Sequence, residues 1–156
     1  MHKKIIKVVS KLKKKKLSLS VAESCTGGMM SQNITAISGA SKIFTFGIIT
    51  YSNKSKIKYL KVPFEIIKKY GSVSEECCYS MVTNLAKISG TKICIAITGI
   101  AGPNGGTKHK PVGLVFVGVK KDKKIKIVKY FFKNKSRDAI RKNSVRKSFE
   151  LIDRLI

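Results

Sequence analysis

The stretch Ala22-Glu23-Ser24-Cys25-Thr26-Gly27-Gly28 joins a predicted strand to a predicted helix. Residues 17–22 alternate apolar and polar side chains, which predicts the strand. Residues 26–37 predict the helix, whose glycine-rich start leaves backbone N–H groups unpaired and partly positive. Such a turn is a common place for a nucleophilic serine, because the N–H groups can hold an oxyanion or a phosphate. By spacing alone, Ser24 is equally suited to capping the helix.

The rest of the pattern extends this unit into an α/β protein. β-Branched and aromatic runs predict strands, and Gly, Pro and capping Ser residues bound the helices. We predict helices at 2–15, 54–60, 63–71, 74–90 and from 136 to the end, and further strands at 43–51, 93–98, 114–119 and 125–132. This order predicts a single domain over residues 1–156, a three-layer α/β/α sandwich with a mixed, mostly parallel sheet.

A glycine-rich loop over residues 99–113 follows the apolar strand 93–98. Its backbone can approach a ligand closely, and a phosphate or ribose contact fits the pattern. No Gly-Lys-Ser/Thr follows, so the loop is not a P-loop. A structural loop that covers the edge of the sheet is the alternative. The candidate substrate-binding residues in this part of the chain are Thr98, Gly99, Gly102, Asn104 and Gly105.

The charge balance is strongly basic, with 33 Lys and Arg against 8 Asp and Glu and a formal net charge of +25. This raises a nucleic-acid-binding surface as a hypothesis. Only four of the cations are arginine, the residue usually used for base edges and bidentate phosphate contacts, and lysines occur in every segment. A general compositional bias therefore explains the charge as well as a binding face does. Weak, non-specific binding to polyanions at low salt is expected in either case.

Composition also limits the class of protein. No apolar run reaches the roughly 18 residues of a membrane helix, and residues 1–9 lack the apolar core of a secretory signal. We therefore expect a cytoplasmic protein without a membrane partner. The four cysteines form no CxxC pair and only two histidines are present, so we expect reduced thiols and no metal.

Four sequence motifs follow one another along the chain, namely residues 22–28, Thr50-Tyr51-Ser52-Asn53 with Lys56, Val73-Ser74-Glu75-Glu76, and residues 98–106 with Lys110-Pro111-Val112-Gly113. In this order they resemble one known family, the CinA C-terminal domain family, whose enzymes are nicotinamide-mononucleotide amidohydrolases. The resemblance runs from about residue 5 to the end.

The resemblance implies deamidation of nicotinamide mononucleotide to nicotinate mononucleotide and ammonia, within pyridine nucleotide recycling. It places the family's serine nucleophile on Ser24, its tyrosine on Tyr51 and its lysine on Lys56. No cofactor or metal is implied. The resemblance also implies a homodimer or higher assembly. The chain looks like the family's stand-alone form.

Amide hydrolysis needs a nucleophile, a base, a proton for the leaving ammonia and an oxyanion site. His2 lies at a terminus and His109 on a loop, so no Ser-His-Asp triad is available. A Ser–Lys arrangement is a known alternative, since burial or neighbouring cations can lower the pKa of a lysine. The hypothesis is that Lys56, through or beside Tyr51, deprotonates Ser24. The candidate oxyanion donors are the backbone N–H groups of Cys25, Thr26, Gly27 and Gly28.

Arg137 and Arg141 lie four residues apart on the last predicted helix and share a face. They resemble the family's Gly-Asp-Arg-x-x-Ile/Val-Arg pattern, although Lys135-Ser136 replaces the Gly-Asp. A phosphate clamp is the corresponding hypothesis, because arginine binds phosphate through two parallel hydrogen bonds.

Two other functions remain open at this stage. One is a non-catalytic, competence- or nucleic-acid-associated binding protein, suggested by the net charge and the family's name. The other is an amidase of the same mechanism with a different substrate. One contiguous basic stripe away from Ser24 would favour the binding protein, whereas scattered lysines would weaken it.

Overall fold

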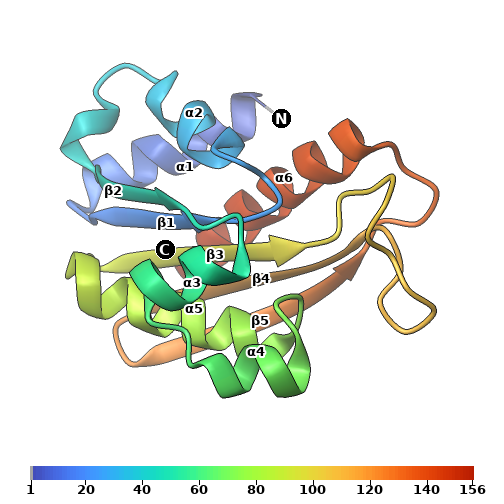
Figure 1. The fold of residues 1–156 in the computed structure, drawn as a ribbon. Coiled ribbons are helices and arrows are strands. Elements are labelled where there is room, and N and C mark those ends of the chain that lie inside the picture. The colour runs from blue at the N-terminus through green and yellow to red at the C-terminus, as the bar shows by residue number, and fades with distance from the viewer. Residues whose placement is uncertain (1) are drawn as a thin grey trace.

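One five-stranded sheet forms the centre of the computed structural model, which describes residues 2–156 (Figure 1). The strand order is β2-β1-β3-β4-β5. β1 pairs in parallel with both β2 and β3, whereas β4 is antiparallel to β3 and to β5. Four strands therefore share one direction, and the predicted mixed sheet with mostly parallel strands is confirmed. The strands are β1 Leu19–Glu23, β2 Phe44–Ile49, β3 Ile93–Gly99, β4 Leu114–Lys121 and β5 Lys124–Phe131.

Helices cover both faces of the sheet and complete the predicted three layers (Figure 1). One layer consists of α1 His2–Lys14, α2 Met29–Thr35 and α6 Arg137–Leu155. The other consists of α3 Asn53–Leu60, α4 Phe64–Tyr70 and α5 Glu75–Ser89. A short 3-10 helix, η1 Ala40–Lys42, precedes β2. None of the helices described is both long and apolar enough to cross a bilayer.

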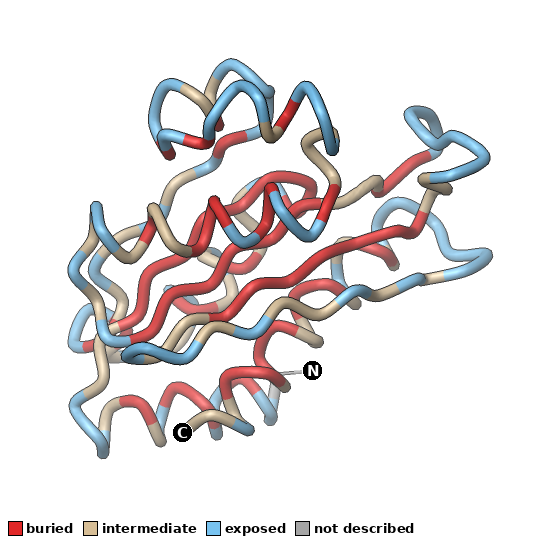
Figure 2. The backbone as a smooth tube through the Cα atoms, turned by 90° about the horizontal axis from the view of Figure 1, so that it is seen from below, coloured by how far each residue is buried: buried red, intermediate tan, exposed pale blue. Residues whose placement is uncertain are grey.

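The central strand β3 shows how the two cores are divided. Ile93, Ile95 and Ile97 pack with the α1, α2 and α6 layer, whereas Cys94 and Ala96 pack with the α5 side. This alternation follows from the two-residue period of a strand. Figure 2 shows the inner strands as continuous buried runs. A strand covered on both faces reads as a continuous apolar run, which is why residues 93–98 were recognisable from sequence.

The helix after the Ser24 turn is shorter than predicted. It begins at Met29 rather than at residue 26 and ends at Thr35 rather than at residue 37. Gly27 and Gly28 adopt positive φ angles of 56° and 92°, which keep these residues outside the right-handed helix. Likewise β2 ends at Ile49, two residues before the predicted end at Tyr51. The turn between β1 and α2 and the segment after β2 are therefore both longer than the sequence predicted.

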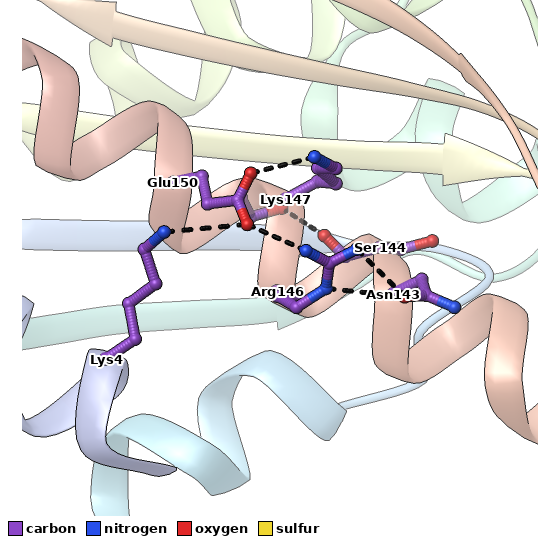
Figure 3. A network of polar contacts seen from close by, with 7 residues as sticks. Lys4, Asn143, Ser144, Arg146, Lys147 and Glu150 are labelled. Atoms are coloured by element: carbon purple, nitrogen blue, oxygen red, sulfur yellow. Dashed lines mark hydrogen bonds and ion pairs between the residues drawn. The ribbon is translucent and has the colours of Figure 1, made fainter. Parts of the chain in front are cut away.

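The basic helix α1 packs its apolar side on the core and pairs part of its charge with α6. Ile5, Val8 and Leu12 are buried. On α6, the Glu150 carboxylate contacts Lys4 of α1 at 3.6 Å and Arg146 and Lys147 of its own helix at 2.9 Å (Figure 3). α1 is therefore part of the packed domain and not a free basic arm.

Replacement of Glu150 by Gln tests this ion-pair network. The hydrogen bond from Lys147, together with neighbouring cations, holds the pKa of Glu150 below its usual range. A lowered pKa means that the carboxylate stabilises the fold above the ordinary value of 4.5, and that this contribution disappears as the pH falls through the lowered pKa. Glu150→Gln should therefore lower the free energy of unfolding by about 1 kcal/mol at pH 7 and by less at pH 3, measured by urea denaturation.

Asp138→Asn is the matched control, because Asp138 pairs with Lys142 on the same helix but its side chain is 59% exposed. Its effect should be smaller than that of Glu150→Gln at pH 7. Equal effects of the two substitutions would contradict the stabilising role assigned to the Glu150 ion pairs.

Candidate active site

Ser24 directly follows β1 at the carboxyl end of the parallel strands. Its backbone N–H donates to the carbonyl of Ile97 in β3 at 3.0 Å. On the other side, the N–H of Thr50 donates to the carbonyl of Glu23 at 2.8 Å. β2 and β3 lie on opposite sides of β1, so the strand order reverses here. Ligands of open α/β sheets bind outside the strand ends at such a switch point.

Lys56 belongs to α3, and its side chain reaches Ser24 through the protein interior. Its side chain is only 1% exposed, and its Nζ lies 2.8 Å from the Ser24 Oγ. The same Nζ donates to the carbonyl of Thr50 at 2.8 Å and contacts the carbonyl of Tyr51 at 3.5 Å. Burial lowers the pKa of Lys56 from its ordinary value of 10.5, because the charged form is poorly solvated there. No ion pair among residues 2–156 includes Lys56, so no carboxylate opposes this effect.

A reciprocal cap fixes the start of the helix that carries Lys56. The Ser52 hydroxyl accepts from the N–H of Ser55, and the Ser55 hydroxyl accepts from the N–H of Ser52. Such a capping box orients the first turn of a helix. It therefore fixes the direction from which the Lys56 side chain enters the interior.

The Tyr51 side chain lies at the surface, apart from the Ser24–Lys56 contact. It is 57% exposed, and its hydroxyl accepts a hydrogen bond from Nη2 of Arg137 at 2.8 Å. Among the described residues, this hydroxyl makes no hydrogen bond to Ser24 or Lys56. Of the two arrangements left open by the sequence, this geometry matches the one in which Lys56 contacts Ser24 beside Tyr51 and not through its hydroxyl.

The start of α2, predicted to hold an oxyanion or phosphate, is instead occupied by the protein's own Glu23. One oxygen of this fully buried carboxylate accepts from the N–H groups of Gly28 at 3.1 Å and Met30 at 3.0 Å. The other accepts from the N–H of Ser31 at 2.8 Å and from its hydroxyl at 2.7 Å. No ion pair among residues 2–156 includes Glu23, and its carboxylate is stabilised by the start of the helix, where negative charge is favourable.

The four predicted oxyanion donors therefore separate into two pairs. The N–H of Gly28 binds Glu23, and the N–H of Gly27 donates to the carbonyl of Ser24 at 3.0 Å. Within residues 2–156, the N–H groups of Cys25 and Thr26 have no hydrogen-bond acceptor. Cys25 also lines the cavity at this edge of the sheet, whereas Thr26 is fully buried.

A cavity of about 410 Å³ opens at this edge of the sheet. Seven of the predicted residues line it, namely Cys25, Tyr51, Gly99, Gly102, Asn104, Gly105 and Arg137. Ser24, which is 7% exposed, adjoins the cavity through Cys25 and is not itself among the lining residues. The remaining lining residues were not among the candidate site residues singled out from the sequence; they are Gly71, Ser72, Val73, Ile100, Ala101, Thr107 and Lys110.

Two residues predicted to touch the ligand instead support the walls of the site. Thr98 is buried, and its hydroxyl donates to the carbonyl of Ser72 at 2.7 Å. Arg141 donates from Nη2 to the carbonyl of Thr26 at 2.7 Å and so holds the serine turn. Of the predicted arginine clamp, only Arg137 lines the cavity, where its Nη1 donates to the carbonyl of Gly102 at 2.7 Å.

Cys25 is the other nucleophilic side chain at this turn. Burial raises the pKa of its thiol to about 12, so the reactive thiolate is scarcely populated at neutral pH. All four cysteines are buried and free. Within the described part of the chain, no three His, Cys, Asp or Glu side chains gather in a group that could hold a metal ion.

Comparison with known proteins agrees with this architecture. Residues 2–156 match the sequence model of the CinA C-terminal domain, and the chain belongs to this family. A CinA-like protein of Kosmotoga olearia is 52% identical over 112 residues, which cover 72% of this chain but 27% of that protein. The chain thus spans about a quarter of the length of that curated relative.

Two solved structures share the fold over almost their whole length. The competence/damage inducible protein CihA from Agrobacterium tumefaciens is 32% identical, with a TM-score of 0.96 over 99% of this chain and 94% of that chain. The competence damage-inducible protein A from Klebsiella pneumoniae is 27% identical, with a TM-score of 0.94 over 99% and 96%.

The role of Glu23 can be tested by its isosteric replacement. Glu23→Gln removes the negative charge and turns one acceptor into a donor that faces N–H groups. Because the site is fully buried, the free energy of unfolding should fall by about 2–3 kcal/mol in urea denaturation. Ser31→Ala, which removes one hydroxyl donor to the same carboxylate, should cost about 1 kcal/mol. A Glu23→Gln protein as stable as the native one would refute the assigned role.

Proposed function

We propose that this protein is an amidohydrolase in which Ser24 is the nucleophile and Lys56 the general base. The observation that carries the proposal is the buried contact of 2.8 Å between the Lys56 Nζ and the Ser24 Oγ. A serine is activated when a base lies within hydrogen-bonding distance of its hydroxyl. A lysine acts as that base when burial lowers its pKa, which is the direction of the shift here.

The neighbouring carbonyls orient the amine for this role. When Lys56 is neutral, its two N–H bonds can point to the carbonyls of Thr50 and Tyr51. The lone pair then faces the Ser24 hydroxyl, which donates its proton to Nζ. A base held by two fixed acceptors needs little reorganisation before the reaction.

In the first half of the reaction, Lys56 takes the proton of Ser24 and the Oγ attacks the carboxamide carbon. The N–H groups of Cys25 and Thr26 would stabilise the resulting oxyanion. Lys56 then returns the proton to the amide nitrogen, and the C–N bond breaks. Ammonia departs, and the acyl group stays bound to Ser24 as an ester. In the second half, water attacks this ester and gives its proton to Lys56. Lys56 passes that proton to the Ser24 oxygen as the carboxylic acid is released.

For the substrate we propose nicotinamide mononucleotide, with nicotinate mononucleotide and ammonia as products. The support is membership of the CinA C-terminal domain family, together with a cavity of about 410 Å³ beside Ser24. That volume lies within the range usual for small-molecule sites. The lining has both apolar surface and backbone groups of the glycine-rich loop, as a nucleotide requires.

The arrangement of the lysines gives less support to a nucleic-acid-binding protein. Exposed lysines lie on α1, on α3 and on the edge strand β5, and so on both helical layers and one edge of the sheet. A groove-binding protein concentrates its cations on one face or along one helix. A buried Ser–Lys pair would also have no use in such a protein.

Ammonia release from nicotinamide mononucleotide tests the proposed activity. The native protein should release ammonia, and Ser24→Ala should lose at least about a thousandfold in kcat, because no acyl-enzyme can form. Ser41→Ala, at an exposed serine of η1, should retain full activity. Equal release by the native and Ser24→Ala proteins would exclude Ser24 as the nucleophile. No release by a folded native protein would exclude this substrate.

The pH profile tests the base. Only neutral Lys56 can accept the serine proton, so kcat/KM should rise with pH and level off above a midpoint that lies below 10.5. Lys56→Met should abolish this rise and most of the activity. Lys54→Met, at an exposed position of the same helix, should preserve both. An unchanged profile in Lys56→Met would contradict the assignment.

A further inference from the structure

The cavity beside Ser24 carries an excess of positive charge that has no role in the proposed hydrolysis. Its lining includes two cations, Lys110 and Arg137, and no carboxylate. Neither cation takes part in an ion pair among residues 2–156. Amide hydrolysis by Ser24 and Lys56 requires neither charge.

Lys110 is held at the wall of the cavity by the fold of its own loop. Its N–H donates to the Thr107 hydroxyl at 3.0 Å, and its carbonyl accepts from the N–H of Thr107 at 2.8 Å. Its ammonium donates to the carbonyl of Tyr70 at the end of α4. This contact uses one of three donors and leaves the positive charge uncompensated.

A glycine makes room for this ammonium. A Cβ at position 71 would lie 2.8 Å from the Lys110 Nζ, and Gly71 has a positive φ of 77° that favours glycine. Lys110 is partly buried, whereas Lys108 and His109 on the same loop are exposed. Lys110 thus differs from the many solvated lysines of the chain.

Among residues 2–156, Arg137 donates hydrogen bonds only to neutral acceptors, the carbonyl of Gly102 and the hydroxyl of Tyr51. A guanidinium has five N–H donors, so further donors remain for an anion. Two uncompensated cations on the walls of one cavity favour a ligand that carries a negative group.

We propose that Lys110 is a specificity-determining residue, whose ammonium, acting with Arg137 in the same cavity, binds an anionic phosphate of the substrate. The inference rests on the proposed deamidase function and extends it. The cavity would select phosphorylated amides over neutral nucleosides.

The first experiment does not depend on turnover. Inorganic phosphate is titrated into the native protein, Lys110→Met and Lys108→Met by isothermal calorimetry at low salt. Lys108→Met removes the same formal charge from the same loop, so it controls for the overall charge of +25. Phosphate affinity should fall roughly tenfold in Lys110→Met and stay near the native value in Lys108→Met. Equal affinities of the two variants would overturn the proposal.

The second experiment measures selectivity. The kcat/KM for nicotinamide mononucleotide is divided by that for nicotinamide riboside, which lacks the phosphate. This ratio should fall roughly tenfold in Lys110→Met, mainly through KM, and remain native in Lys108→Met. An equal loss on both substrates would show a merely structural role and overturn the proposal. If neither compound is hydrolysed, the proposed deamidase function fails, and the phosphate titration alone decides the role of Lys110.

Discussion

The buried contact between Lys56 and Ser24 is the constraint on which the arrangement of the site depends. A lysine with 1% exposure is costly, because the interior solvates its charge poorly. The fold meets this cost with the Ser24 hydroxyl and with carbonyls at the end of β2. Those acceptors exist only where β1 and β2 end side by side and α3 begins directly afterwards. The burial of Lys56 therefore depends on the order of the strands, because the acceptors of its amine lie where β1 and β2 end.

The Ser24 turn also shows how the protein divides the polar groups of a helix start. The Glu23 carboxylate accepts hydrogen bonds from N–H groups at the start of α2, and the N–H of Gly27 donates to the carbonyl of Ser24. The N–H groups of Cys25 and Thr26 have no acceptor among residues 2–156, and Cys25 also lines the cavity. An anion at the start of α2 would compete with a carboxylate that is already in place. A site for a substrate anion is therefore expected elsewhere in the cavity, where Lys110 and Arg137 supply positive charge.

The large net charge has a limited structural role. Five ion pairs are formed among residues 2–156, and three of them involve Glu150. Most lysines have no carboxylate to pair with and lie in solvent, where mutual repulsion is weakened by screening. Position and burial, more than charge itself, separate Lys56 and Lys110 from the other lysines.

Much of this protein was determined by the sequence alone. The period of apolar residues predicted most strands and helices, because local patterns reflect local geometry. The motifs around Ser24, Tyr51 and Lys56 indicated the family through their resemblance to it. Three features could not be read in this way: the helix bounds at Gly27 and Gly28, the position of Lys110 at the cavity wall, and the supporting contacts of Thr98 and Arg141. Each depends on contacts between segments distant in the chain, such as Arg141 with Thr26. Tertiary structure decided these points, because sequence spacing does not specify which donor meets which acceptor once the layers pack.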